Sequence, residues 1–208
     1  PTEEYALLFA FMSLIHPEAS ERDAYAARAR VLLMHVIDQA AKGPAEGKAF
    51  RDPSFSWNDR SRWNGRSFGL TVDWIYPYLS PSDKAAIHKV FVRWSEEIRS
   101  EGRFHPEPVG RLNDPAMLAD ASLLRWSINN YFTAGMRNMG YMAMALDPAD
   151  DPGNQLHDSL KDAIGARLYL LDNMLYTDAR GGLSPEGFQY APQALGYVAE
   201  FLLALYTA

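Results

Sequence analysis

The sequence predicts an all-α fold built from antiparallel helix pairs. Apolar residues recur with a helical period along most of the 208 residues, and no segment of useful length shows the two-residue alternation of a β-strand. The candidate helices are bounded by capping residues and by glycine or proline, and consecutive helices are joined by turns. A helical array of this kind can be a bundle, a solenoid or a toroid.

The N-terminal region is expected to form two helices. Thr2 is the candidate N-cap of the first helix, which should end near His16. Ser20 and Asp23 resemble a capping box at the start of the second helix, and the Gly-Pro pair at residues 43–44 should stop it. A long connection follows before the helical pattern returns.

A third helix is predicted over residues 61–79, and the most regular helical pattern of the chain comes directly after it. Ser80 is the expected N-cap, with Pro81 at the first helical position, Asp83 at the third and Gly102 beyond the last turn. The apolar residues of this helix share one face: Ile87, Val90, Phe91, Trp94 and Ile98.

The helical pattern resumes over residues 117–146, with a break expected near residues 127–130. Pro148 and Pro152 mark a turn. A long helix should follow, because apolar residues line one of its faces: Leu156, Leu160, Ile164, Leu168, Leu171 and Leu175. The last helix begins behind a tight turn within GGLSPEGFQYAPQALGYVAEF, residues 181–201.

Composition limits the classes of protein to consider. Hydrophobic residues make up 48% of the chain, enough for one folded domain over residues 1–208. The net charge of -6 argues against nucleic-acid binding, and there is neither a polybasic membrane patch nor an apolar run of about 18 residues. Without cysteine there are no disulfides and no thiolate metal sites. Because the chain opens with PTEEYALL and ends within the apolar FLLALYTA, we expect it to be part of a longer protein.

Aromatic residues make up 12% of the chain, and many lie in predicted loops or at helix starts. A plain bundle would keep them on its buried stripes. Aromatic rings beside arginine, asparagine and aspartate are typical of a sugar-binding cleft, where the ring stacks on the sugar and polar groups bind its hydroxyls. The residues in question are Phe55, Trp57, Trp63, Phe104, Tyr131, Phe188 and Tyr190.

Tyr190 and Glu186 precede the last apolar helix. Tyr190 is either a core tyrosine or a phenol that transfers a proton, and the second role needs a nearby cation or hydrogen-bond donor. Glu186 is either a carboxylate favoured by the helix N-terminus or a residue that orients Tyr190 or its sugar. The adjacent glycines indicate a sharp turn or the close approach of a ligand.

Two further segments carry candidate binding residues. Asn129 either caps a helix that begins at Asn130 or directs an amide at a ligand carboxylate or hydroxyl, and Arg137 follows about two turns later as a surface ion pair or a ligand contact. Upstream, four polar or aromatic residues at a helix start indicate an acidic ligand, because a helix N-terminus does not favour cations. They are Arg62, Trp63, Asn64 and Arg66.

Neither the histidines nor known sequence motifs identify a functional site from the pattern alone. His105, beside Arg103 in a loop, is the one histidine considered for a site, and no pair of histidines has metal-ligand spacing. The sequence contains no P-loop, dinucleotide fingerprint, nucleophile elbow or zinc signature. No metal and no cofactor is therefore predicted.

Three segments in this order resemble the helical domain of heparinase II/III-like and related alginate lyases: SFGLTVDWIYPYLSPSDKAAI, SINNYFTAGMRNMGYMAMALDPADDP and DARGGLSPEGFQYAPQALGYVAEFLLAL. The resemblance covers about residues 55 to 208 and implies an incomplete (α/α) toroid. It also implies cleavage of uronate-containing polysaccharides by β-elimination, and a periplasmic or secreted location.

The resemblance implies roles for individual residues. Tyr190 matches the catalytic tyrosine, and Asn129 or Asn130 matches the residue that binds the uronate carboxylate. The expected substrate-binding residues are Trp63, Arg66, Tyr131, Arg137, His105 and Glu186. Tyr131 stands where many members of the family have histidine, and the segment that supplies a further catalytic histidine is absent from these 208 residues.

Two alternatives remain at this point. A toroid glycoside hydrolase would need two carboxylates across a cleft, for which Asp73 and Glu186 are the candidates. A non-catalytic helical scaffold would bind glycan or protein without collecting these residues on one face. The expected partner is an acidic polysaccharide or oligosaccharide, with neither nucleic acid nor membrane.

Overall fold

A computed structural model describes residues 1–45, 59–100 and 114–208, apart from the side chains of residues 42–45. These ranges contain helices and turns but no strand, which confirms the predicted all-α class. The helices of the first half are α1 (Thr2–Ile15), α2 (Ala19–Ala45), α3 (Asp59–Asn64), α4 (Arg66–Trp74), η2 (Tyr76–Tyr78) and α5 (Pro81–Ser100).

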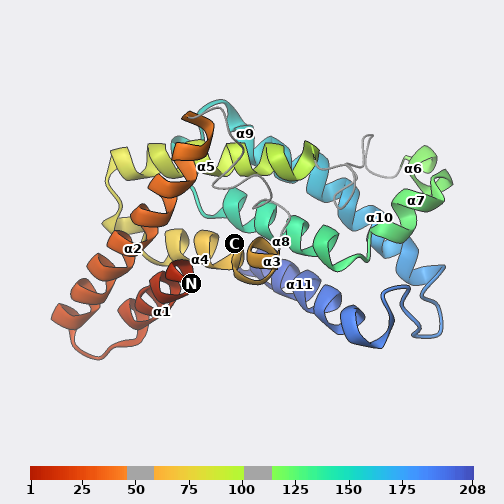
Figure 1. Cartoon of the computed structure of the whole chain (residues 1–208), viewed down its shortest axis with the longest axis horizontal. Coiled ribbons are helices and arrows are strands. Elements are labelled where there is room, and N and C mark those ends of the chain that lie inside the picture. Colours follow the sequence, from red (N-terminus) through yellow and green to blue (C-terminus); the bar gives the residue numbers. More distant parts are fainter. Residues whose placement is uncertain (46–58, 101–113) are drawn as a thin grey trace.

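The second half contains more short elements (Figure 1). Its helices are α6 (Pro115–Ala119), α7 (Ala121–Trp126), α8 (Asn130–Met144), η3 (Pro148–Asp150), η4 (Pro152–Asn154), α9 (Gln155–Ser159), the π-helical turn η5 (Leu160–Ile164), α10 (Gly165–Tyr176) and α11 (Gly187–Thr207). The single long helix expected from Leu156 onward is thus α9 and α10 with a π-helical turn between them.

The helices α8 and α11 run parallel, with their N-termini together. Near both starts, the amide of Asn130 donates to the carboxylate of Glu186 at 2.7 Å. Further along both helices, the Tyr141 hydroxyl donates to the backbone oxygen of Glu200 at 3.1 Å. Since residue numbers rise together from one contact to the next, the positive ends of two helix dipoles meet at the same place.

The helices α1, α3 and α4 extend the same layer in the same direction. Arg60 in α3 pairs with Glu3 near the start of α1 at 2.6 Å, and the rings of Trp74 and Phe11 lie 5.9 Å apart near the ends of α4 and α1. Both α3 and α4 also pack against α8. The layer is therefore ordered α1, α3–α4, α8, α11.

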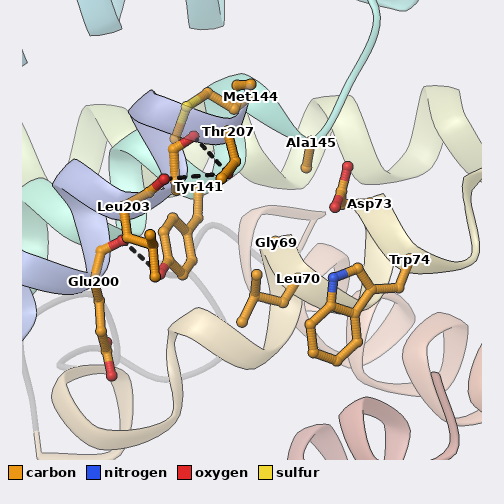
Figure 2. A pocket seen from close by; sticks show the side chains of 12 residues that line it. Gly69, Leu70, Asp73, Trp74, Tyr141, Met144, Ala145, Glu200, Leu203 and Thr207 are labelled. Atoms are coloured by element: carbon orange, nitrogen blue, oxygen red, sulfur yellow. Dashed lines mark hydrogen bonds between the residues drawn. The ribbon is translucent and has the colours of Figure 1, made fainter. Parts of the chain in front are cut away.

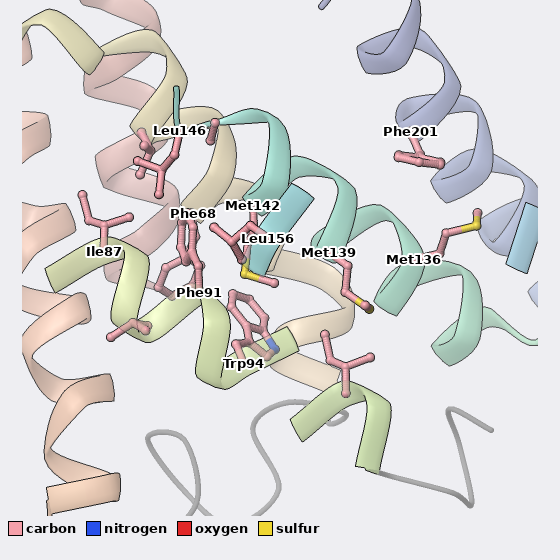
Figure 3. Close-up of a cluster of buried hydrophobic side chains, with 14 of the residues drawn as sticks. Phe68, Ile87, Phe91, Trp94, Met136, Met139, Met142, Leu146, Leu156 and Phe201 are labelled. Atoms are coloured by element: carbon pink, nitrogen blue, oxygen red, sulfur yellow. The ribbon is translucent and has the colours of Figure 1, made fainter. Parts of the chain in front are cut away.

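A second layer of α2, α5 and α9 packs behind the first, and the core lies between the two. Phe68 of α4 meets Trp94 of α5 edge to face, with ring centroids 5.2 Å apart. Figure 3 shows the surrounding cluster, to which α5, α8 and α11 contribute. The predicted apolar face of α5 is buried along its whole length, as the periodicity indicated.

Local hydrogen bonds confirm some predicted helix boundaries. The Ser80 hydroxyl accepts from the backbone N–H of Asp83 at 3.2 Å, and the Asp83 carboxylate accepts from the backbone N–H of Ser80 at 2.8 Å, which forms the cap expected for α5. Asn129 caps α8, and the break predicted near residues 127–130 separates α7 from α8. These caps were predictable because their partners are only two or three residues apart.

Other predicted boundaries were wrong. Thr2 lies inside α1, because the N–H groups of Glu4 and Tyr5 already donate to the Pro1 oxygen. α2 begins at Ala19, before the predicted capping box, and Asp23 instead accepts a hydrogen bond from the Tyr78 hydroxyl at 2.7 Å.

Two expected helix spans also differ from the structure. The Gly-Pro pair at residues 43–44 does not end α2, which continues to Ala45, since a proline in the last turn removes only one helical hydrogen bond. The helix expected over residues 61–79 divides at Gly65 into α3 and α4, and α4 ends before Pro77.

The close approach of α11 to α8 depends on Gly140. A Cβ atom there would lie 2.2 Å from the ring of Phe201, which is fully buried. We expect Gly140→Ala to lower the free energy of unfolding by about 1–3 kcal/mol, because the ring cannot move without disturbing the core. Urea denaturation measures the change.

The matched control is Gly196→Ala on α11, where an added Cβ meets nothing within 4 Å. This substitution should raise stability by about 0.5–1 kcal/mol, since alanine favours a helix interior over glycine. Higher stability in both variants would show that helix propensity outweighs the α8–α11 contact.

Candidate functional site

Asn129 presents a fixed amide at the start of α8. Its side-chain oxygen accepts from the backbone N–H of Tyr131 at 2.9 Å, as an N-cap does. The amide nitrogen must therefore point the other way, and it donates to Oε1 of Glu186 at 3.0 Å. The two roles weighed for this residue, helix cap and carboxylate ligand, are filled by opposite ends of one side chain.

Asn130 is oriented by a different partner. Its Oδ1 accepts from Nη1 of Arg62, a group that can only donate. The Nδ2 of Asn130 is thus directed at Oε2 of Glu186, 2.7 Å away. Each of the two amides has its oxygen occupied by a donor, so neither can turn an acceptor toward the carboxylate.

Glu186 receives a third hydrogen bond from the backbone N–H of Asn130, at 3.3 Å. The carboxylate lies at the start of α11 and at the start of α8, where both helix dipoles favour a negative charge. Three N–H donors from two adjacent residues therefore form a carboxylate-binding site, defined here as the amides of Asn129 and Asn130 with the backbone N–H of Asn130.

Arg62 fixes the orientation of Asn130 in this site. The side chain is buried, its guanidinium lies 5.0 Å from the ring of Trp63 and 4.6 Å from that of Tyr131, and it pairs with Asp59 at 2.8 Å. Contacts with two rings and a carboxylate hold the cation in place. The structure thus gives Arg62 a role in orienting Asn130, whereas the sequence suggested direct contact with an acidic ligand.

Tyr190 lies in the first turn of α11, four residues after Glu186, and Gly187 between them has a positive φ of 70°. Its side chain is 40% exposed, so it is not a core tyrosine, and its hydroxyl makes no hydrogen bond to any residue within the described ranges. It is close enough to Tyr131 for the two phenols to interact electrostatically. Tyr190 is therefore a phenol open to a ligand beside the carboxylate-binding site.

Tyr131 is held differently. Its hydroxyl donates to Asp59 at 2.9 Å. Burial, together with this hydrogen bond, raises the pKa of Tyr131 above its usual value. The hydroxyl of Tyr131 is thus kept protonated and already has a hydrogen-bond partner.

Arg137 is a structural residue. Only 1% of its side chain is exposed, and it donates to Glu200 at 2.9 Å and to the backbone oxygen of Arg62 at 2.8 Å. Burial lowers the pKa of Arg137. The expectation of a surface ion pair or ligand contact was wrong, because the arginine holds α3 against α8 and α11 from inside.

Arg66 lies outside the immediate site. It pairs with Glu200, the same carboxylate that Arg137 uses, so two cations share one negative charge. Sequence reasoning missed Glu200 and also Tyr197, whose ring lies 4.4 Å from the guanidinium of Arg137. The signal was present in the spacing of Tyr190, Tyr197 and Glu200, which places them along one side of a helix.

Solvent reaches the site through an open depression of about 260 Å³ lined by Arg125, Trp126, Asn129 and Glu186. Arg125 is an exposed cation that pairs with Asp178 at 3.1 Å. The depression thus offers the ring of Trp126, the cation of Arg125 and the amide of Asn129 around the carboxylate of Glu186. Neither Arg125 nor Trp126 was among the predicted site residues.

Asp73 belongs to a separate pocket of about 360 Å³ near the C-terminal end of α11. Figure 2 shows Asp73 and Trp74 near Gly69 and Leu70, with Tyr141 and Thr207 on the far side. Burial in this pocket raises the pKa of the Asp73 carboxyl. Glu186 lies at the other end of the 21-residue helix, about 30 Å away at 1.5 Å per residue. The two carboxylates are too far apart to serve one glycosidic bond.

Several candidates from the sequence lie outside the described residues, namely His105, Phe55, Trp57 and Phe104. Within residues 1–45, 59–100 and 114–208, no group of three histidine, aspartate or glutamate side chains is arranged to hold a metal ion. No helix in the described part of the chain is long and apolar enough to cross a membrane.

Comparison of the chain with protein-family models, with curated proteins and with solved structures gives no match.

Proposed function

We propose that this chain is the helical domain of a polysaccharide lyase-like protein that cleaves uronate-containing polysaccharide by β-elimination. One observation carries the proposal: two amides of fixed orientation bind a carboxylate at the start of α11, the end of the helix that also carries the exposed phenol of Tyr190. A uronate brings its own carboxylate, and the proton to be removed is on the adjacent carbon.

The proposed reaction uses these groups in two ways. The phenolate form of Tyr190 takes the proton from the carbon next to the uronate carboxylate, the C4–O4 bond breaks and a C4–C5 double bond forms. The phenol so formed gives a proton to the leaving O4, which restores the phenolate. Charge builds on the carboxylate as the proton leaves, and the N–H donors of Asn129 and Asn130 stabilise it there. A general base of this kind contributes typically about a hundred- to ten-thousand-fold.

The arrangement of helices supports an incomplete (α/α) toroid. The helices α1, α3–α4, α8 and α11 run parallel in one layer, while α2, α5 and α9 form the layer behind it. Alternation of helices between two such layers is the repeat of an (α/α) toroid, and in the proposed protein the ligand lies where α8 and α11 begin.

We expect the protein to bind acidic oligosaccharides, such as alginate or glycosaminoglycan fragments, and to bind them more weakly as salt is added. The expectation rests on the carboxylate-binding site and on Arg125, which lines the same depression and stays mostly exposed although it pairs with Asp178. Calorimetric titration at two salt concentrations, with a neutral glucan as control, measures it. Equal binding of the neutral glucan at low salt would contradict the proposed ligand class.

The products test the reaction itself. A lyase generates an unsaturated uronate that absorbs in the ultraviolet, together with one new reducing end for each bond cleaved. New reducing ends without ultraviolet absorbance would indicate a hydrolase. Binding without either product would indicate a glycan-binding scaffold.

A further inference from the structure

The carboxylate-binding site is already full. All three of its N–H donors are directed at Glu186, at 2.7 Å, 3.0 Å and 3.3 Å. A uronate that uses the same donors cannot lie beside this carboxylate, because two negative charges would then compete for hydrogen bonds that satisfy only one. If the proposed function holds, ligand binding therefore requires Glu186 to leave.

Glu186 is held by neutral donors alone. It makes no ion pair with any residue within the described ranges, and its side chain is only partly buried. Its release exchanges three hydrogen bonds from amides for hydrogen bonds from water, which are similar in free energy. Arg66 and Arg137, in contrast, share a carboxylate that is fixed by two cations.

The segment that carries Glu186 makes few contacts. Gly181, Gly182 and Gly187 have φ values of 97°, 91° and 70°, a region that favours glycine, and no atom would lie within 4 Å of a Cβ added at any of them. Leu183 and Phe188 are 63% and 90% exposed. Movement of residues 181–188 thus disrupts little packing.

We propose that Glu186 is a built-in competitor: its carboxylate occupies the site at Asn129 and Asn130 until the carboxylate of a hexuronate displaces it. The proposal rests on the proposed function and adds a determinant of specificity. A neutral sugar has no group that can replace Glu186, so it leaves the site closed. A uronate does replace it, and its carboxylate then lies at the end of α11 that carries Tyr190.

The test compares Glu186→Ala and Glu186→Gln with the unmodified chain, using a mannuronate trisaccharide in calorimetric titration. Removal of the competing charge should tighten binding by about tenfold or more, since a close like charge opposes the ligand by more than about 1.4 kcal/mol. Asp172→Asn is the matched control, because it removes an exposed negative charge on α10 without touching either amide or the ion pair of Arg125. The control should change affinity by less than about twofold, as expected for a screened surface charge.

Kinetics separates competition from positioning. If Glu186 is a competitor, its replacement lowers KM and leaves kcat nearly unchanged. If Glu186 instead orients Tyr190 or the sugar, both variants should lose kcat, and the proposal is then wrong. Unchanged or weaker trisaccharide binding in both variants also overturns it.

A smaller probe tests the site without any assumption about the lyase reaction. Glu186→Ala leaves three N–H donors around a space that acetate can fill, so acetate should raise the Tm of this variant more than chloride does at equal ionic strength. The unmodified chain should show no such difference. No acetate effect in the variant would overturn the competitor proposal, whereas an acetate effect without uronate binding or cleavage would reject the proposed function.

Discussion

Replacing Tyr190 with phenylalanine is expected to lower lyase turnover by about a hundred- to ten-thousand-fold and to leave uronate binding nearly unchanged. The ring keeps its place on α11, and the hydroxyl makes no hydrogen bond to the described residues that folding would lose. Only the group that moves the proton is removed. Initial rates of formation of the ultraviolet-absorbing product, with calorimetric affinities for an uncleaved uronate, measure the two effects separately.

Tyr131→Phe is the matched control, since it removes a neighbouring phenol hydroxyl. That hydroxyl donates to Asp59, and burial with this hydrogen bond raises the pKa of Tyr131. We expect turnover to fall by less than about tenfold, because a phenol held in its protonated form is a poor base. Full activity in Tyr190→Phe, or an equal loss in both variants, would remove Tyr190 from the proton-transfer step.

Local features of the site were predictable from the sequence. The Asn129 cap and the break before Asn130 follow from residue types within a few positions. The apolar face of α5 follows from its period, and the sharp turn at residues 181–182 follows from paired glycines, both of which have positive φ. Each of these depends on contacts within one or two helical turns, where sequence spacing determines geometry.

The partners of the charged residues were not predictable, because they lie far apart in the chain. Arg62 orients an amide 68 positions away, and Arg137 reaches Glu200 63 positions away. Spacing does not reveal such pairs, so Arg137 was assigned to the surface although it is buried. Glu186 was considered as an orienting residue, and only its contacts with both amides indicate a competitor.

The orientation of Asn130 gives a second large expected effect. Asn130→Asp keeps the shape of the side chain and keeps the hydrogen bond from Arg62, but it replaces the N–H₂ group with an oxygen 2.7 Å from the carboxylate of Glu186. Two carboxylates at this distance cannot both be ionised without a large penalty. Because Glu186 can leave the site and relieve the repulsion, we expect the loss in the free energy of unfolding at neutral pH to be limited to about 1 kcal/mol. Urea denaturation at neutral and mildly acidic pH should show the loss diminishing as the pair gains a proton.

The same substitution should weaken uronate binding by on the order of a hundredfold or more, because the ligand carboxylate meets the new charge.

Adding Glu186→Gln to Asn130→Asp separates the effect on stability from the effect on uronate binding. The glutamine amide can donate to the carboxylate introduced at position 130, so the double variant should recover most of the lost stability, and the coupling free energy between positions 130 and 186 follows from the four variants. Uronate binding should not recover, since the site then presents an acceptor to an anion. If the double variant recovers both stability and uronate binding, the amide of Asn130 serves only to hold Glu186. If Asn130→Asp lowers neither stability nor uronate binding, the hydrogen bond between Asn130 and Glu186 contributes nothing to folding or to recognition.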